Sequence, residues 1–181
     1  MFSWTILLFI LCSALTPALC CDWLTHYTQL SSESLRLLQQ MGGELTEQES
    51  PVTFPKKLYR RIHGDERESQ LVFIRDSLEL ISDLYSNFTS STLDATKTEH
   101  FLTIIHRQAD ELNGCVSTKK RADKRLRKYY KRLARRTLYR TGGSAASWEL
   151  IRKETKLHLD QLHMLVTSIR HAAVTPTQQQ H

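Results

Sequence analysis

The cysteines are the residues of this chain whose chemistry can be assigned most directly. Cys12 and Cys20 lie in an apolar N-terminal segment, whereas Cys21 and Cys115 lie in the remainder of the chain. In an oxidising compartment, two such thiols form a disulfide by default. A bridge that closes a loop of about 95 residues strongly restricts the unfolded chain. Two free thiols remain the alternative at this point.

Patterns typical of catalysis or metal binding are missing from the sequence. The eight histidines show no ligand cluster, and His158 and His163 are five residues apart, a poor fit to one helix face. There is no glycine-rich phosphate loop, His-Glu-x-x-His or Cys-x-x-Cys. We therefore expect no enzyme, no cofactor and no metal, with histidines at or near the surface. Asn87-Phe88-Thr89 is a glycosylation sequon, which makes Asn87 a candidate modification site.

The first twenty residues have the features of a secretory leader. Residues 1–20 contain no Lys, Arg, Asp or Glu, and an apolar run ends at Pro17. Small residues at Ala18 and Cys20 predict cleavage before Cys21. A membrane anchor is the alternative, but the run is shorter than the roughly 20 apolar residues that span a bilayer. The pattern predicts a signal peptide over 1–20 and a secreted, extracellular protein.

Apolar residues recur at intervals of three and four along residues 21–181, which predicts a single all-α domain. We expect no helix in the connection 44–64, which contains Pro51 and Pro55, and a polar tail over about 172–181. A long first connection lets the first two helices run parallel, as in an up-up-down-down four-helix bundle. The expected helices cover about 23–41, 65–85, 96–114, 117–140 and 145–171.

Positive charge is concentrated in the fourth expected helix. The segment 119–140 contains twelve Lys or Arg and one acid, Asp123, in a chain of net charge +6. Three interpretations stay open: a solvated face, a contact face for an acidic receptor or heparan-type glycans, and a site for nucleic acid or membrane. Inward positions for Tyr129, Tyr130 and Leu133 argue against membrane insertion, and a secreted chain would not meet nuclear nucleic acid.

Four segments resemble the teleost type I interferons, in order along the chain. The last is similar to the Trp-Glu-hydrophobic-hydrophobic-Arg-x-Glu run in the final helix of type I interferons generally. The segments are Cys21-Asp22-Trp23-Leu24, Val52-Thr53-Phe54-Pro55-Lys56-Lys57-Leu58-Tyr59, Leu126-Arg127-Lys128-Tyr129-Tyr130 and Trp148-Glu149-Leu150-Ile151-Arg152-Lys153-Glu154.

The resemblance implies a helical cytokine bundle with an additional fifth helix in the second crossover. It also implies a Cys21–Cys115 bridge in a two-cysteine subgroup, because Ala146 stands where other members have a cysteine. The expected function is that of a monomeric, secreted antiviral cytokine. It would bring together a two-chain class II cytokine receptor and induce antiviral genes through kinase and transcription-factor signalling.

The resemblance also suggests which residues contact the receptor. Arg152 matches a receptor-facing arginine, and Glu49 stands near the place of an arginine hot spot in mammalian relatives. We expect the 44–64 connection to be held by packing of Phe54 and Leu58. The candidates, all expected to be exposed, are Lys56, Lys57, Arg60, Arg61, Arg152 and Lys156. The alternative function is a cationic host-defence or glycan-binding helical protein that acts through the basic helix 119–140.

Overall fold

The computed structural model describes residues 21–86, 92–116 and 123–174. Several sequence expectations fall elsewhere. The signal peptide 1–20, the sequon at Asn87, the expected helix caps Ser117 and Thr118, and residues 175–181 of the polar tail lie outside the described residues.

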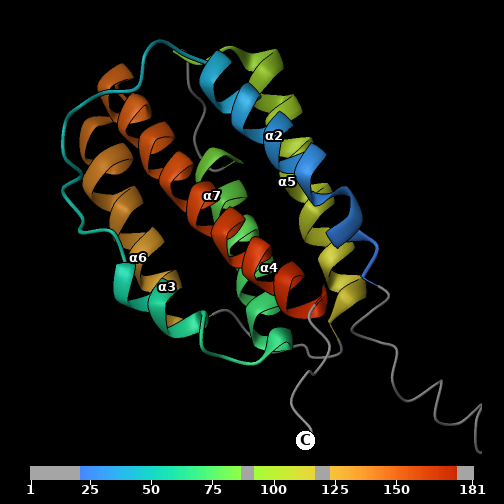
Figure 1. Cartoon of the computed structure of the whole chain (residues 1–181). Helices are drawn as coiled ribbons and strands as arrows, with labels where there is room; N and C mark the ends of the chain where they lie inside the picture. The colour runs from blue at the N-terminus through green and yellow to red at the C-terminus, as the bar shows by residue number, and fades with distance from the viewer. Residues whose placement is uncertain (1–20, 87–91, 117–122, 175–181) are drawn as a thin grey trace, which may run out of the picture.

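Four long helices form the bundle, and the described residues contain no strand. Figure 1 shows that α2 and α4 run in one direction whereas α5 and α7 run in the other. The expected up-up-down-down topology is therefore confirmed. An additional helix, α6, lies between α5 and α7 in the chain and fills the second crossover (Figure 1). The four long helices are α2 (Trp23–Gln40), α4 (Arg67–Ser86), α5 (Ala95–Cys115) and α7 (Ala145–Val174).

Aspartates cap the starts of two helices. The Asp94 side chain accepts a hydrogen bond of 2.9 Å from the Lys97 amide, so α5 starts earlier than the Thr96 cap predicted from the sequence. The Asp123 side chain accepts a hydrogen bond of 2.7 Å from the Arg125 amide and caps the start of α6 (Lys124–Ala134). Both carboxylates satisfy amide donors that the first turn of a helix leaves without partners.

The expectation of an irregular 44–64 connection was wrong at its C-terminal end. Helix α3 (Lys56–Ile62) begins directly after Pro55. Proline is excluded from a helix interior but not from its start, where no amide donor is required. The apolar residues of α3 face the core: Leu58, Tyr59 and Ile62 are all buried. The described residues thus contain one more α-helix than the five expected.

A wider turn ends the basic helix. Residues Arg135–Tyr139 form a π-helical segment, η1, directly after α6. The turn to α7 follows, with Gly142 and Gly143 at φ values of 63° and 76°. Residues with a Cβ rarely adopt this left-handed backbone, so the two glycines allow the reversal that the sequence predicted here.

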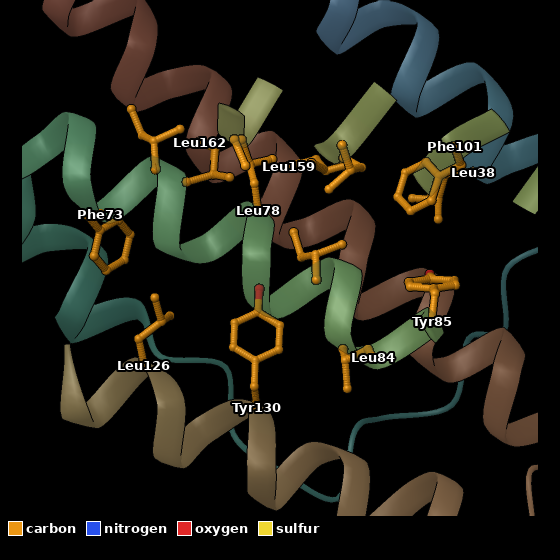
Figure 2. Close-up of a cluster of buried hydrophobic side chains, with 14 of the residues drawn as sticks. Leu38, Phe73, Leu78, Leu84, Tyr85, Phe101, Leu126, Tyr130, Leu159 and Leu162 are labelled. Atoms are coloured by element: carbon orange, nitrogen blue, oxygen red, sulfur yellow. The ribbon is translucent and has the colours of Figure 1, made fainter. Parts of the chain in front are cut away.

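All the helices contribute to one apolar core, as the close-up in Figure 2 shows for ten of its residues. Tyr130 reaches from α6 toward α4, and Leu38 and Phe101 lie beside Tyr85 (Figure 2). Burial of such aliphatic and aromatic surface is the main term that stabilises a helical bundle. The labelled residues are Leu38, Phe73, Leu78, Leu84, Tyr85, Phe101, Leu126, Tyr130, Leu159 and Leu162.

A disulfide joins Cys21, immediately before α2, to Cys115, the last residue of α5. The two Cα atoms are 5.0 Å apart, and the cysteines are separated by 94 positions in the sequence. The bridge therefore holds the start of the first helix of the bundle against the end of the third.

We predict that replacing both cysteines (C21S/C115S) lowers the free energy of unfolding by about 2–5 kcal/mol, because the unfolded chain regains the freedom of a long loop. Urea denaturation of residues 21–181, followed by circular dichroism, measures this. The double variant should keep its helical signal in the absence of urea. A denaturation midpoint equal to that of the disulfide-bonded protein would contradict the prediction.

Candidate functional site

The cations expected on the connection lie on the outward side of α3. Lys56, Lys57 and Arg60 are exposed, as the sequence predicted. Arg61 is also exposed and forms an ion pair with Asp123, the residue that caps α6. Helix α3 thus presents four positive side chains to solvent and contacts the N-terminus of the basic helix through one of them.

A second exposed group lies on α7. Lys156, which was expected to be exposed, is half-buried, because its ammonium group lies 2.7 Å from the Asp160 carboxylate instead of extending into solvent. Two apolar side chains that were not among the predicted receptor contacts, Leu157 and Met164, are 39% and 48% exposed. They are seven residues apart and so lie on the same side of the helix, two turns from each other. Both fall outside the buried stripe of α7, which was the signal that could have identified them.

Arg152 was expected to be exposed, and that expectation was wrong. Only 1% of its surface is accessible. Its guanidinium donates hydrogen bonds to three backbone carbonyls: Leu38 (3.0 Å), Gln39 (2.8 Å) and Gly43 (2.7 Å). The last turn of a helix leaves such carbonyls without partners, and five N–H donors allow an arginine to satisfy several of them. Arg152 therefore caps the C-terminus of α2.

The fit around Arg152 requires a glycine. A Cβ atom at Gly42 would lie 2.7 Å from the nearest guanidinium nitrogen, closer than non-bonded atoms approach. Burial lowers the pKa of Arg152 from its usual value, yet an arginine keeps its proton in proteins. The side chain thus places a positive charge at the negative end of the α2 dipole, where it is stabilising.

Neighbouring cations hold the connection between α2 and α3. The Lys153 ammonium donates to the carbonyls of Glu47 (3.1 Å) and Gln48 (2.9 Å). Arg136 donates to the carbonyl of Pro51 at 3.0 Å. These bonds act on the backbone of the connection, so they fix its path over α7 and η1 whatever side chains it carries.

Aromatic packing holds the end of the connection, as the sequence predicted for Phe54 and Leu58. Leu58 is buried, and the Phe54 ring lies 5.6 Å from Tyr59 and 6.3 Å from Tyr129, centroid to centroid. The same ring lies 4.6 Å from His158. Aromatic pairs at these separations stabilise a fold beyond the area that they bury.

His158 is the second residue whose position was predicted wrongly. It is completely buried instead of lying at the surface, and burial lowers its pKa to about 3. Its Nδ1 atom is 2.6 Å from the Tyr59 hydroxyl, whereas Nε2 has no partner among the described residues. The imidazole is therefore neutral at physiological pH and serves as a core residue that links α7 to α3.

A tyrosine–carboxylate hydrogen bond completes this polar part of the core. Tyr129 donates to Glu154 at 2.5 Å, and burial raises the pKa of Glu154 above its ordinary value. The Ser50 side chain lies close to Glu154, so this carboxylate joins α7 to α6 and faces the connection. Arg152, Lys153 and Glu154 all contribute to holding the segment that follows α2.

The described residues offer no chemistry for catalysis. No group of three or more His, Cys, Asp or Glu side chains among them is arranged to hold a metal ion. Ser82 and His106 share a hydrogen bond between α4 and α5, but no hydrogen bond or ion pair joins a described carboxylate to that histidine, so the pair lacks the third member of a hydrolase triad. In the described part of the chain, no helix is long and apolar enough to cross a membrane.

Known proteins resemble this chain along most of its length. The interferon alpha/beta domain family matches residues 24–169. The chain is 42% identical to interferon a3 of Oncorhynchus mykiss over 169 residues, which cover 92% of this chain and 97% of that protein. The structure is similar to that of zebrafish interferon 1, with a TM-score of 0.74 and 32% identity over 82% of this chain and 99% of that one. The similarity extends from α2 into α7.

We predict that Arg152→Ala lowers the free energy of unfolding by about 3–5 kcal/mol, because it leaves three carbonyl acceptors without their charged donor. Chemical denaturation of both proteins measures the difference. Arg36→Ala is the matched control, since Arg36 is exposed and ion-paired with Glu33; its effect should stay below about 1 kcal/mol. Equal effects of the two substitutions would refute the capping role.

We further predict that His158 makes the protein less stable as the pH falls from about 6.5 to about 3. In this window the unfolded imidazole binds a proton and the folded one does not, so unfolding is favoured as acid is added. His158→Phe keeps an aromatic ring but cannot titrate. The free energy of unfolding, measured against pH, should fall more steeply for the wild type than for this variant. Parallel curves would exclude His158 as the cause.

Proposed function

The chain belongs to the interferon alpha/beta family, and from this premise we propose that it is secreted and acts by bringing together the two chains of a class II cytokine receptor. As a type I interferon it is a cytokine and not an enzyme, and its partner is a cytokine receptor. The observation that carries the proposal is the family match over residues 24–169. The signal would consist of bringing the receptor chains together, with no bond made or broken in the ligand.

We place one receptor chain on the face formed by α2, the connection after it, and α7. The outward side of α7 supports this choice, because Leu157 and Met164 are exposed apolar side chains beside the charged pair Lys156–Asp160. Apolar anchors surrounded by polar groups are typical of the centres of protein interfaces. The cations Lys56, Lys57, Arg60 and Arg61 on α3 would lie toward the rim and steer an acidic receptor surface.

Arg152 is not part of this contact. Because it is buried under the end of α2, its effect on receptor binding would be indirect, through the position of the connection. This corrects the role that the resemblance implied for it.

The second receptor chain would bind the opposite side, formed by α4, α5 and α6. A surface hollow between α4 and the end of α6 supports this choice. Apolar groups of Leu80, Leu84, Tyr130 and Tyr139 line it, and Asp83, Arg127 and Lys131 surround them. Tyr139 is 65% exposed, so a receptor side chain could pack against it.

The remaining parts of the proposal concern the cell. Residues 1–20 would direct secretion, Asn87 would carry a glycan, and the mature chain would act as a monomer. Receptor assembly would start kinase and transcription-factor signalling that induces antiviral genes. Heparan-type glycans are a second class of partner that fits the basic helix, and this contact would leave the cytokine role intact.

We predict that Leu157→Ser combined with Met164→Ser weakens binding to one receptor chain by about tenfold or more, because exposed apolar anchors carry much of the affinity of an interface. Surface plasmon resonance with purified receptor ectodomains measures the loss. Thermal stability should stay unchanged, since both side chains are exposed.

Tyr139→Ser is the matched control on the other side of the bundle. It should weaken binding to the second receptor chain and spare the first. If both variants weakened the same chain, or if neither had an effect, the assignment of two opposite faces would be wrong.

A protection assay tests the function as a whole. Purified residues 21–181 are added to fish cells, and antiviral gene induction and virus yield are recorded before and after reduction of the disulfide. Induction that reduction weakens is the expected result. Direct killing of microbes without gene induction would favour the cationic host-defence alternative.

A further inference from the structure

The exposed side of α6 and η1 is almost entirely basic. From Lys124 to Arg140 the sequence contains no acid, and the apolar residues Leu126, Tyr129, Tyr130, Leu133 and Leu138 are all buried in the core. Except for Tyr139, every exposed residue of this stretch carries a positive charge. These exposed cations are Lys124, Arg125, Lys128, Lys131, Arg132, Arg135, Arg136 and Arg140.

Four of the cations surround one hollow in the surface. Lys128, Lys131, Arg132 and Arg135 line it without any other described residue. Their spacing of three, four and seven residues places them on the same side of successive helical turns. We call this feature the basic hollow.

The basic hollow contains no compensating charge. None of its four side chains forms an ion pair with another described residue. Some exposed cations elsewhere do so: Arg36 pairs with Glu33 and Arg107 with Glu111. Like charges three and four residues apart destabilise a helix by a few tenths of a kcal/mol per pair. An external anion would remove this repulsion, and its charge must extend along two helical turns to reach all four groups.

The residues around the basic hollow indicate which class of anion would bind there. A helix that inserts into a membrane surface needs exposed apolar residues beside its cations, and here the apolar stripe is buried. Single-stranded nucleic acid is bound by stacking on aromatic side chains, and no aromatic residue lines the hollow. Arginine and lysine together suit tetrahedral oxyanions, which arginine can bind with two parallel hydrogen bonds.

We propose that the basic hollow binds the sulfate groups of glycosaminoglycan chains at the cell surface. The proposal rests on the proposed secretion, since these glycans are extracellular, but not on the assignment of receptor faces. A chain that continues toward the N-terminus of α6 would meet Lys124 and Arg125, so the site extends over about 16 Å of helix. Such binding would concentrate the cytokine near the cells that carry its receptor.

The test uses folded residues 21–181 and immobilised heparin. The quadruple variant K128S/K131S/R132S/R135S should lose about tenfold or more in affinity near physiological salt. The slope of log affinity against log salt should become shallower by about three, because each lost contact with a polyanion removes a little under one unit. The control R36S/K97S/R107S/R170S removes the same number of charges outside the hollow and should bind within about twofold of the wild type.

Four competitors distinguish the anion class. Sulfated heparin should displace the wild type from the surface, whereas desulfated heparin, single-stranded DNA and phosphatidylserine vesicles should compete poorly. Equal losses for the two quadruple variants would show that net charge alone matters and would overturn the proposal. Equal competition by desulfated heparin, by DNA or by vesicles would overturn it as well.

Folding is checked in the same samples. The K128S/K131S/R132S/R135S variant should keep the helical signal of the wild type, because relief of the charge repulsion offsets the lower helix propensity of serine. The double variant K131S/R132S disturbs the helix less and gives a second measurement. Its slope of log affinity against log salt should change by about half as much as that of the quadruple variant. No receptor is present in this assay, so failure to bind heparin leaves the receptor proposal standing, and failure of receptor binding leaves the glycan site standing.

Discussion

The end of α2 depends on a buried side chain of α7. The guanidinium of Arg152 binds three carbonyls there, which would otherwise lack a charged donor. From that fixed point Lys153 donates hydrogen bonds to the next carbonyls of the connection, and Glu154 faces it. Three consecutive residues of α7 therefore set the route from α2 to α3, and with it the position of the proposed receptor-binding surface.

The local pattern of apolar and polar residues was sufficient to predict most of the fold. Helices α2, α5 and α7 have one apolar stripe each and clear boundary residues, so their existence and direction followed from the sequence. Helix α3 was missed because it has seven residues, fewer than two full turns of pattern, and because Pro55 before it resembles a loop signal. The two aspartate caps show the same limit: several polar residues near a helix start could cap it, and the fold uses one.

The site was less predictable, since its decisive contacts join distant parts of the sequence. Arg152 meets carbonyls 109 to 114 positions away, and His158 meets Tyr59 at a separation of 99. A polar residue on a helix can be expected to be exposed only if no distant part of the chain packs against it. A short window of the sequence contains only one residue of each such contact, so it cannot show the partner. The exposed cations of α3 were predictable because their apolar neighbours already accounted for the buried side.

The contact between Arg152 and Gly42 also bears on how this sequence can evolve. A Cβ atom at position 42 would push the Arg152 guanidinium out of its hydrogen-bonded position, and loss of Arg152 opens the end of α2 even if Gly42 remains. Each first step is therefore disfavoured on its own. The two positions form an epistatic pair, and lineages that keep this helix end should inherit them together while the residues around them drift.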